Sequence, residues 1–123
     1  MAKKILLVDD ARSTLWMAQR ILEQGTPYQI VTAKDGVDAM ASAMREAPDL
    51  LLMDVVMPRM NGFEVCRRLR LEESTRRVPI ILLTTRVEMQ YLEAGYQSGC
   101  NDYLNKPVKG EELIALLHSY LGE

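Results

Sequence analysis

The sequence predicts an α/β domain in which a parallel five-stranded sheet carries helices on both faces. Its clearest signal is the run Leu50-Leu51-Leu52-Met53, which leads into Asp54 without a polar interruption. An unbroken apolar run of this length is typical of a strand buried on both sides, as the strands of parallel sheets are. Strand-like and helix-like segments also alternate five times along the chain with short connections, which is the pattern of a doubly wound sheet.

The overall composition fits one domain spanning residues 1–123. The chain has 48% hydrophobic and 26% charged residues and a formal net charge of −2, values typical of globular proteins. No apolar run approaches the roughly 20 residues that cross a bilayer, and the basic residues are too dispersed to predict direct nucleic-acid binding. Cys66 and Cys100 lack the spacing of a metal site. We therefore expect a cytoplasmic protein with reduced thiols, no membrane insertion and no output domain.

The first segments predict a strand and a helix. Residues 3–8 are mostly apolar and form a strand that ends at Asp9-Asp10. A helix then starts at Ser13 or Thr14 and continues to about Gln24, where a Gly-Thr-Pro sequence stops it.

The next segments repeat this alternation. Residues 28–33 are rich in β-branched side chains that alternate with polar ones, which predicts a strand. After a turn at Asp35-Gly36, residues 37–45 form a helix that ends before Pro48. The buried strand at residues 50–54 follows.

The second half of the chain continues the pattern. A loop over residues 58–62 precedes a helix from residue 63 to about residue 71. Residues 78–84 are almost wholly apolar and form the fourth strand, and the helix at residues 88–97 is closed by a glycine. A short strand at residues 102–105 and a helix at residues 110–121 complete the domain.

Polar side chains occur where four of the predicted strands end. They are Asp9 and Asp10, then Asp54, Thr84 and Lys106. If the first and third strands are neighbours, three carboxylates share one pocket, and such a cluster either holds a proton or recruits a cation. Oxygen ligands suit Mg²⁺, and a hydroxyl with an ammonium suits the oxygens of a phosphoryl group. Each acid alone is better explained as an ordinary cap or turn residue, but the combination predicts a site for Mg²⁺ and a phosphoryl group.

Five short motifs coincide with these strand ends. They are Val8-Asp9-Asp10, Met53-Asp54-Val55-Val56-Met57-Pro58, Asn61-Gly62, Leu83-Thr84-Thr85 and Asp102-Tyr103-Leu104-Asn105-Lys106-Pro107. Together they resemble the receiver domains of two-component response regulators over essentially the whole chain. The resemblance implies a flavodoxin-like fold with strand order 2-1-3-4-5 and a cis peptide bond before Pro107.

The resemblance also implies a role for each acid. Asp54 would accept a phosphoryl group from a phosphohistidine on a sensor kinase, because a carboxylate is a competent nucleophile toward phosphorus. Asp10 and Asp54 would bind Mg²⁺ directly together with the backbone carbonyl of Val56, and Asp9 would act through a bound water.

The remaining motif residues would contact the phosphoryl group or report on it. By resemblance, Thr84 and Lys106 would contact phosphoryl oxygens. Tyr103 would act as a switch residue that changes its rotamer. Lys106 can also form an ion pair with Asp54 in the resting state. Two positions depart from a common polar pattern, and we expect that Val56 slows self-hydrolysis and that Arg86 shields the phosphate.

Two surfaces are candidates for partner binding. At 100° per residue the first helix turns Thr14, Met17, Ala18, Ile21 and Leu22 toward the sheet and Trp16 away from it. Trp16 either anchors a kinase or phosphotransfer helix or lies on the stem of Arg20. The helix at residues 88–97 is apolar on two sides, and the sequence leaves open which side packs on the sheet. One side carries Met89, Leu92 and Tyr96, and the other carries Val87, Tyr91 and Ala94.

We therefore expect a stand-alone response regulator that acts as a switch, catalysing its own phosphorylation on Asp54 and its slow dephosphorylation. Its partners would be a histidine kinase or phosphotransfer protein and a downstream target protein, as in motility and chemotaxis regulators, and it would be a monomer or a phosphorylation-dependent dimer.

Three other classes share parts of this pattern. A dehalogenase-type phosphatase would require a second acidic residue at position 56, where this chain has Val56. A flavin-binding protein would require an uncharged, hydroxyl-rich loop after the first strand, where this chain has Asp9-Asp10. A pseudo-receiver would dock partners without phosphorylation, and the full set of pocket residues argues against it.

Overall fold

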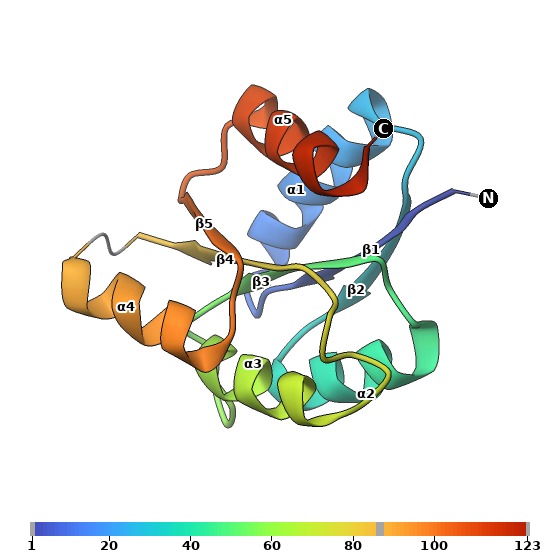
Figure 1. Ribbon diagram of the computed structural model, residues 1–123. Coiled ribbons are helices and arrows are strands. Elements are labelled where there is room, and N and C mark those ends of the chain that lie inside the picture. Colours follow the sequence, from blue (N-terminus) through green and yellow to red (C-terminus); the bar gives the residue numbers. More distant parts are fainter. Residues whose placement is uncertain (1, 86–87, 123) are drawn as a thin grey trace.

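The computed structural model describes residues 2–85 and 88–122 (Figure 1). Its described residues form one parallel five-stranded sheet in the order β2-β1-β3-β4-β5. The strands are β1 (Lys4–Val8), β2 (Gln29–Ala33), β3 (Leu50–Asp54), β4 (Ile80–Thr84) and β5 (Asp102–Asn105). Both the doubly wound sheet and the strand order 2-1-3-4-5 are therefore confirmed.

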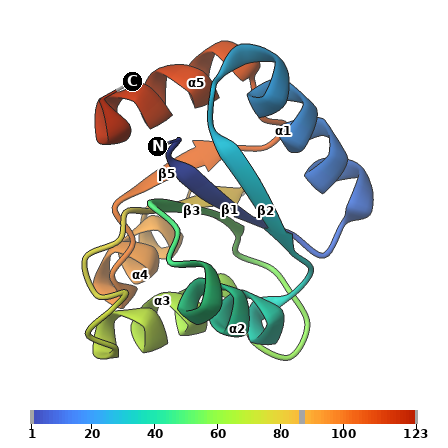
Figure 2. The same ribbon diagram turned by 90° about the vertical axis from the view of Figure 1, so that its right-hand side faces the viewer.

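The helices cover both faces of this sheet. They are α1 (Arg12–Gly25), α2 (Gly36–Glu46), α3 (Gly62–Leu71), α4 (Met89–Ser98) and α5 (Gly110–Leu121). Figures 1 and 2 show α1 and α5 on one face and α2, α3 and α4 on the other. Over the described residues, each helix falls short of the length and hydrophobicity that a membrane span needs.

The sheet separates two apolar clusters. Every residue of β3 is buried, and alternate side chains point to opposite faces. Leu51 and Met53 join the cluster beneath α2 and α3, whereas Leu50 and Leu52 join the cluster beneath α1 and α5. The prediction of a strand buried on both sides is correct, and it places Asp54 at the carboxyl edge in the middle of the sheet.

Several element boundaries differ from the prediction by one or two residues. Helix α1 begins at Arg12 rather than at Ser13 or Thr14, with Ala11 as the N-cap residue. Strand β4 begins at Ile80 rather than at residue 78. Pro79 separates the two positions, and a proline has no N–H to donate to the sheet.

Helix α1 turns a narrower face to the sheet than the angular pattern predicted. Ala18 and Leu22 are buried as expected, but Met17 is 53% exposed, so its predicted inward orientation is wrong. Trp16 is 61% exposed, and the guanidinium carbon of Arg20 lies 5.4 Å from its ring centroid. Of the two alternatives for Trp16, the proximity to Arg20 is present, although through the guanidinium rather than the stem, and most of the indole surface stays accessible.

Helix α4 packs through the side that carries Tyr91. The Tyr91 ring lies 5.2 Å from the ring of Phe63 on α3, and both rings pack against the core beneath α2 and α3. Met89 is 70% exposed and Tyr96 is 50% exposed, so their side of the helix faces outward. Val87, which the sequence grouped with Tyr91, lies outside the described residues.

The two cysteines are free thiols in the interior. Burial, followed by the proximity of Cys100, raises the pKa of the Cys66 thiol to about 12. Burial likewise raises the pKa of the Cys100 thiol to about 11. His118 is exposed on α5, with its ring 6.3 Å from that of Tyr28.

Candidate functional site

The carboxyl edge of the sheet brings three aspartates together. Strands β1 and β3 are neighbours with Val8 opposite Met53, so the residues that follow them lie side by side. Asp9, Asp10 and Asp54 each offer a carboxylate oxygen, and these oxygens lie within 4.8 Å of one another. The predicted acidic cluster is therefore present.

The three acids differ in their exposure. Asp9 and Asp54 are buried, at 2% and 7% exposure, whereas Asp10 is exposed. Asp9 Oδ1 also accepts the backbone N–H of Ala11 at 2.9 Å, next to the start of α1. The pocket therefore has two buried walls and opens to solvent on the side of Asp10.

Lys106 supplies the positive charge of the site. Its Nζ lies 2.9 Å from Asp9 Oδ2 and 3.3 Å from Asp54 Oδ2, so the predicted resting pair with Asp54 is confirmed. The shorter contact goes to Asp9, which the sequence did not indicate. The Lys106 N–H donates to the Thr84 carbonyl at 2.9 Å, and the bond to Pro107 is cis as the resemblance implied.

Burial and charge shift the acidities of this pocket. Burial, followed by repulsion from Asp9, raises the pKa of Asp54, although Lys106 and the backbone N–H of Val56 oppose the rise. Burial acts to lower the pKa of Lys106, but its hydrogen bond to Asp9 and its attraction to Asp54 outweigh that effect and raise it. Any further cation that enters the pocket therefore stabilises the ionised forms of these carboxylates.

This donor set fits a magnesium ion. Three carboxylates converge while Lys106 contributes one positive charge, so negative charge remains in excess when all are ionised. Carboxylate oxygens with an open side for water are the ligands that Mg²⁺ prefers. Val56, two residues beyond Asp54, has an exposed side chain and donates its backbone N–H to the Asp54 carboxylate.

Thr84 and Tyr103 occupy the two neighbouring strands. Thr84 is buried at the end of β4, where it lies opposite Asn105 of β5. The Tyr103 hydroxyl lies 3.2 Å from the backbone carbonyl oxygens of both Tyr91 and Leu92. Tyr103 therefore contacts α4 in this structure. Arg86, expected to shield the phosphate, lies outside the described residues.

The loop after Asp54 is held against α2. Arg59 has a left-handed φ of 69° and forms an ion pair with Asp35, the N-cap residue of α2. Asn61 caps α3 by accepting the N–H of Glu64 at 3.0 Å. These contacts hold the segment that borders the acidic pocket, and the cap explains the Asn61 position of the predicted motif.

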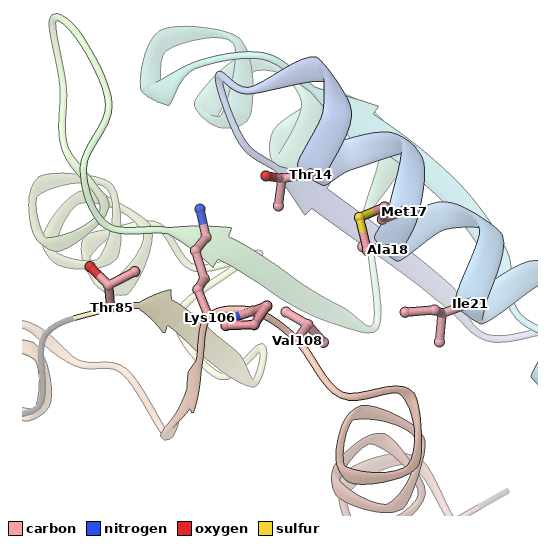
Figure 3. A pocket seen from close by; sticks show the side chains of 8 residues that line it. Thr14, Met17, Ala18, Ile21, Thr85, Lys106 and Val108 are labelled. Carbon is pink, nitrogen blue, oxygen red and sulfur yellow. The ribbon is translucent and has the colours of Figure 1, made fainter.

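An apolar groove of about 260 Å³ adjoins the pocket. Figure 3 shows side chains of α1 on one side of the groove and residues that follow β4 and β5 on the other. It is lined by Thr14, Met17, Ala18, Ile21, Thr85, Lys106, Pro107 and Val108. Lys106 therefore belongs to both the groove and the acidic pocket. The exposure of Met17, which the sequence missed, is explained by its place on the groove wall.

Known proteins share this architecture and sequence. Response regulator PleD of Caulobacter vibrioides is 38% identical over 119 residues, covering 97% of this chain, and the chain spans about a quarter of PleD, 26% of its length. Chemotaxis protein CheY4 of Vibrio cholerae superposes with a TM-score of 0.93 at 33% identity, covering 98% of this chain and 100% of that one.

A third relative has been described with a metal ion. The receiver domain of a sensor histidine kinase from Pseudomonas aeruginosa PAO1, with magnesium coordinated in its active site cleft, superposes with a TM-score of 0.91 at 36% identity over 100% of both chains. Residues 5–118 match the family described as the response regulator receiver domain. On these grounds the chain belongs to the receiver domain family of two-component response regulators.

Proposed function

We propose that this chain acts in a two-component response regulator, and that its Asp54 accepts a phosphoryl group from a phosphohistidine of a histidine kinase or phosphotransfer protein. Phosphorylation then changes its binding to a downstream target protein. The observation that carries this proposal is the convergence of Asp9, Asp10 and Asp54 with Lys106 at the carboxyl edge of the sheet.

In the proposed reaction an Asp54 carboxylate oxygen forms a bond to phosphorus while the bond between phosphorus and the imidazole nitrogen breaks. The electron pair of the broken bond stays on the imidazole, and the product is an acyl phosphate. Lys106, whose Nζ already lies 3.3 Å from Asp54, would stabilise charge on the phosphoryl oxygens. The Thr84 hydroxyl would donate a hydrogen bond to one of them.

A magnesium ion would be held by Asp10, Asp54 and the Val56 carbonyl, with Asp9 acting through a water. When bound, it would offset the negative charge of the carboxylates and of the incoming phosphoryl group. The raised pKa of Asp54 supports this need for a cation, since burial beside Asp9 disfavours the ionised nucleophile.

Intact mass measured after incubation with acetyl phosphate tests the phosphorylation site. We expect a gain of one phosphoryl group in the presence of Mg²⁺, and no gain with EDTA or in Asp54→Asn. The control is Glu73→Gln, which changes an exposed acid outside the pocket and should leave the gain unchanged. A parent protein without any gain would overturn the proposal and favour a pseudo-receiver. A gain retained by Asp54→Asn would overturn the assignment of Asp54 as the phosphorylation site.

The groove beside the pocket is the surface proposed for the phosphodonor protein, and the exposed Trp16, which lies on α1 outside the lining of the groove, is proposed as a second anchor. A helix of the donor seated here would lie next to Lys106, which lines the groove, and could present its phosphohistidine to Asp54. Trp16→Ala should slow phosphotransfer from the cognate kinase. Leu71→Ala removes a residue that is 84% exposed at the end of α3 and should have no effect. Equal rates in the two variants would exclude docking through Trp16.

The proposed protein is a switch, with no separate substrate beyond its phosphodonor. It would catalyse its own phosphorylation and a slow dephosphorylation. We place it in the cytoplasm, where thiols such as those of Cys66 and Cys100 remain reduced. The likeness to a chemotaxis protein favours a role in motility or chemotaxis, with the outward side of α4 as the target-binding surface.

A further inference from the structure

Helix α4 contains a glycine where helices ordinarily avoid one. Gly95 lies inside α4, between Met89 and Ser98, and is buried. A glycine in a helix interior destabilises the helix relative to alanine, because it loses more conformational freedom on folding. Its backbone is not among the positive-φ positions of the described chain, so no unusual dihedral explains the choice. The glycine at position 95 is instead explained by the lack of room for a Cβ atom beside the helix.

The space beside Gly95 is filled by Tyr103. A Cβ atom added to Gly95 would overlap the Tyr103 hydroxyl oxygen and would lie 2.7 Å from its Cζ. It would also lie 3.1 Å from Cε1 of Phe63. The missing side chain therefore leaves a notch in the inner surface of α4, and the phenol of Tyr103 occupies it.

The notch brings the hydroxyl to the helix backbone. Within it, the Tyr103 oxygen lies 3.2 Å from the carbonyl oxygens of Tyr91 and Leu92, and it can donate its hydrogen to either. The Tyr96 ring meets the Tyr103 ring nearly edge-on, with 5.4 Å between centroids. These contacts tie the orientation of Tyr103 to the position of α4.

The same strand also leads to the phosphoryl pocket. Tyr103 lies opposite Leu82 and Asn105 lies opposite Thr84 in the register of β4 and β5. The Lys106 N–H donates to the Thr84 carbonyl at 2.9 Å. Thr84 is therefore joined through the paired backbones of β4 and β5 to the strand that carries Tyr103, and β4 leads along the chain to α4.

We propose that Gly95 is the positioning residue of the switch. The notch that it leaves holds Tyr103 inward against α4, as in this structure, and the response of Tyr103 to phosphorylation depends on access to this notch. The second part rests on the proposed function, since it takes Tyr103 as the group that responds to phosphorylation at Asp54. Gly95→Ala then gives a chain in which Tyr103 is held outward whether or not Asp54 is modified.

A double-mutant cycle on thermal stability tests the notch without phosphorylation. In a Tyr103→Ala background the Tyr103 side chain is gone, so Gly95→Ala should raise Tm by up to roughly 4 °C through helix propensity, with the 3.1 Å approach to Phe63 reducing the gain. In the parent background the same substitution should lower Tm, because Tyr103 loses its place and its hydrogen bond. Equal increases in both backgrounds would overturn the proposal.

Gly110→Ala serves as the matched control. A Cβ at Gly110 would meet only Ile21, at an ordinary contact distance of 3.5 Å. Its effect on Tm should therefore be the same in the parent and Tyr103→Ala backgrounds.

A second experiment separates the notch from the phosphorylation switch. The protein is labelled with 3-fluorotyrosine, and the ¹⁹F resonance of Tyr103 is assigned with Tyr103→Phe. Mg²⁺ and beryllofluoride, a phosphoryl mimic, should shift this resonance in the parent. In Gly95→Ala the resonance should already be displaced and should not respond.

The outcomes of the fluorine experiment are distinguishable. A Gly95→Ala resonance that coincides with the parent's and responds in the same way would overturn the proposal. In another outcome, the Gly95→Ala resonance is displaced but the parent resonance does not shift with beryllofluoride. This result would support the notch and overturn the role of Tyr103 in the proposed function.

Discussion

Replacing Arg70 should destabilise this domain more than its position on a basic helix suggests. Arg70 is half-buried at the end of α3, and its guanidinium donates only to neutral oxygens among the described residues. The contacts are Gly99 O at 2.9 Å, Val78 O at 2.7 Å, Asn101 Oδ1 at 2.9 Å, Arg76 O at 3.2 Å and Thr75 O at 3.3 Å. One side chain thus joins the loop that precedes β4 to the loop that precedes β5.

The size of the effect follows from these contacts. A hydrogen bond from a charged donor contributes about 1.5–3 kcal/mol, and carbonyls that border solvent recover part of this by binding water. Counting the contacts shorter than 3 Å and discounting for rehydration, we expect Arg70→Met to lower the free energy of unfolding by about 3 kcal/mol. Arg70→Lys keeps the charge but has a single nitrogen to donate hydrogen bonds, so we expect it to lower the free energy of unfolding by about 2 kcal/mol.

Urea unfolding followed by far-ultraviolet circular dichroism measures both losses. The matched control is Arg67→Met on the same helix, because Arg67 is exposed and pairs with Glu64 at 3.5 Å. A surface pair of this kind contributes less than about 0.5 kcal/mol. If Arg70→Met and Arg67→Met lower the free energy of unfolding by similar amounts, the role assigned to Arg70 is wrong.

Two further predictions concern the phosphoryl pocket and the loop beside it. Val56→Asn places a polar side chain two residues beyond Asp54 and should speed loss of the phosphoryl group by about tenfold, a barrier change of about 1.4 kcal/mol. The rate is measured after the donor is removed, and a parent that decays within a few seconds without a phosphatase contradicts the idea. Asp35→Asn keeps a capping side chain but removes the ion pair with Arg59. The Asp38 N–H and Arg59 lower the pKa of Asp35 below its ordinary value of 3.8. The stabilisation is therefore present above pH 3.8 and is lost as the pH falls through the lower folded-state pKa. The Tm of the parent should exceed that of Asp35→Asn at pH 7, and the gap should close in acid; a gap that stays constant would exclude this origin.

The parts of the fold that depend on local sequence were predictable. Residues 50–54 form a strand because the apolar run over residues 50–53 is stable only when both faces are buried. The meeting of Asp9, Asp10 and Asp54 followed from topology, since parallel strands deliver their carboxyl ends to one edge.

The parts that depend on side-chain reach were not predictable. Lys106 comes closer to Asp9 than to Asp54, and nothing in the order of residues distinguishes the two acids. Met17 lies on the arc that should face the sheet, but a groove takes the place of a packing partner there. The inward position of Arg70 was not predicted, although Arg70 follows buried Cys66 by one helical turn of four residues, which is a signal for such a position.

The two buried thiols, Cys66 and Cys100, should be unreactive toward thiol reagents at neutral pH. With the pKa of Cys66 near 12 and that of Cys100 near 11, almost no thiolate forms at neutral pH, and the thiolate is the reactive species. A cysteine introduced at an exposed position such as Met17 or Met89 keeps its ordinary acidity and reacts alone. Fluorescent or spin labels can therefore be placed on α1 or α4 without first replacing either native cysteine.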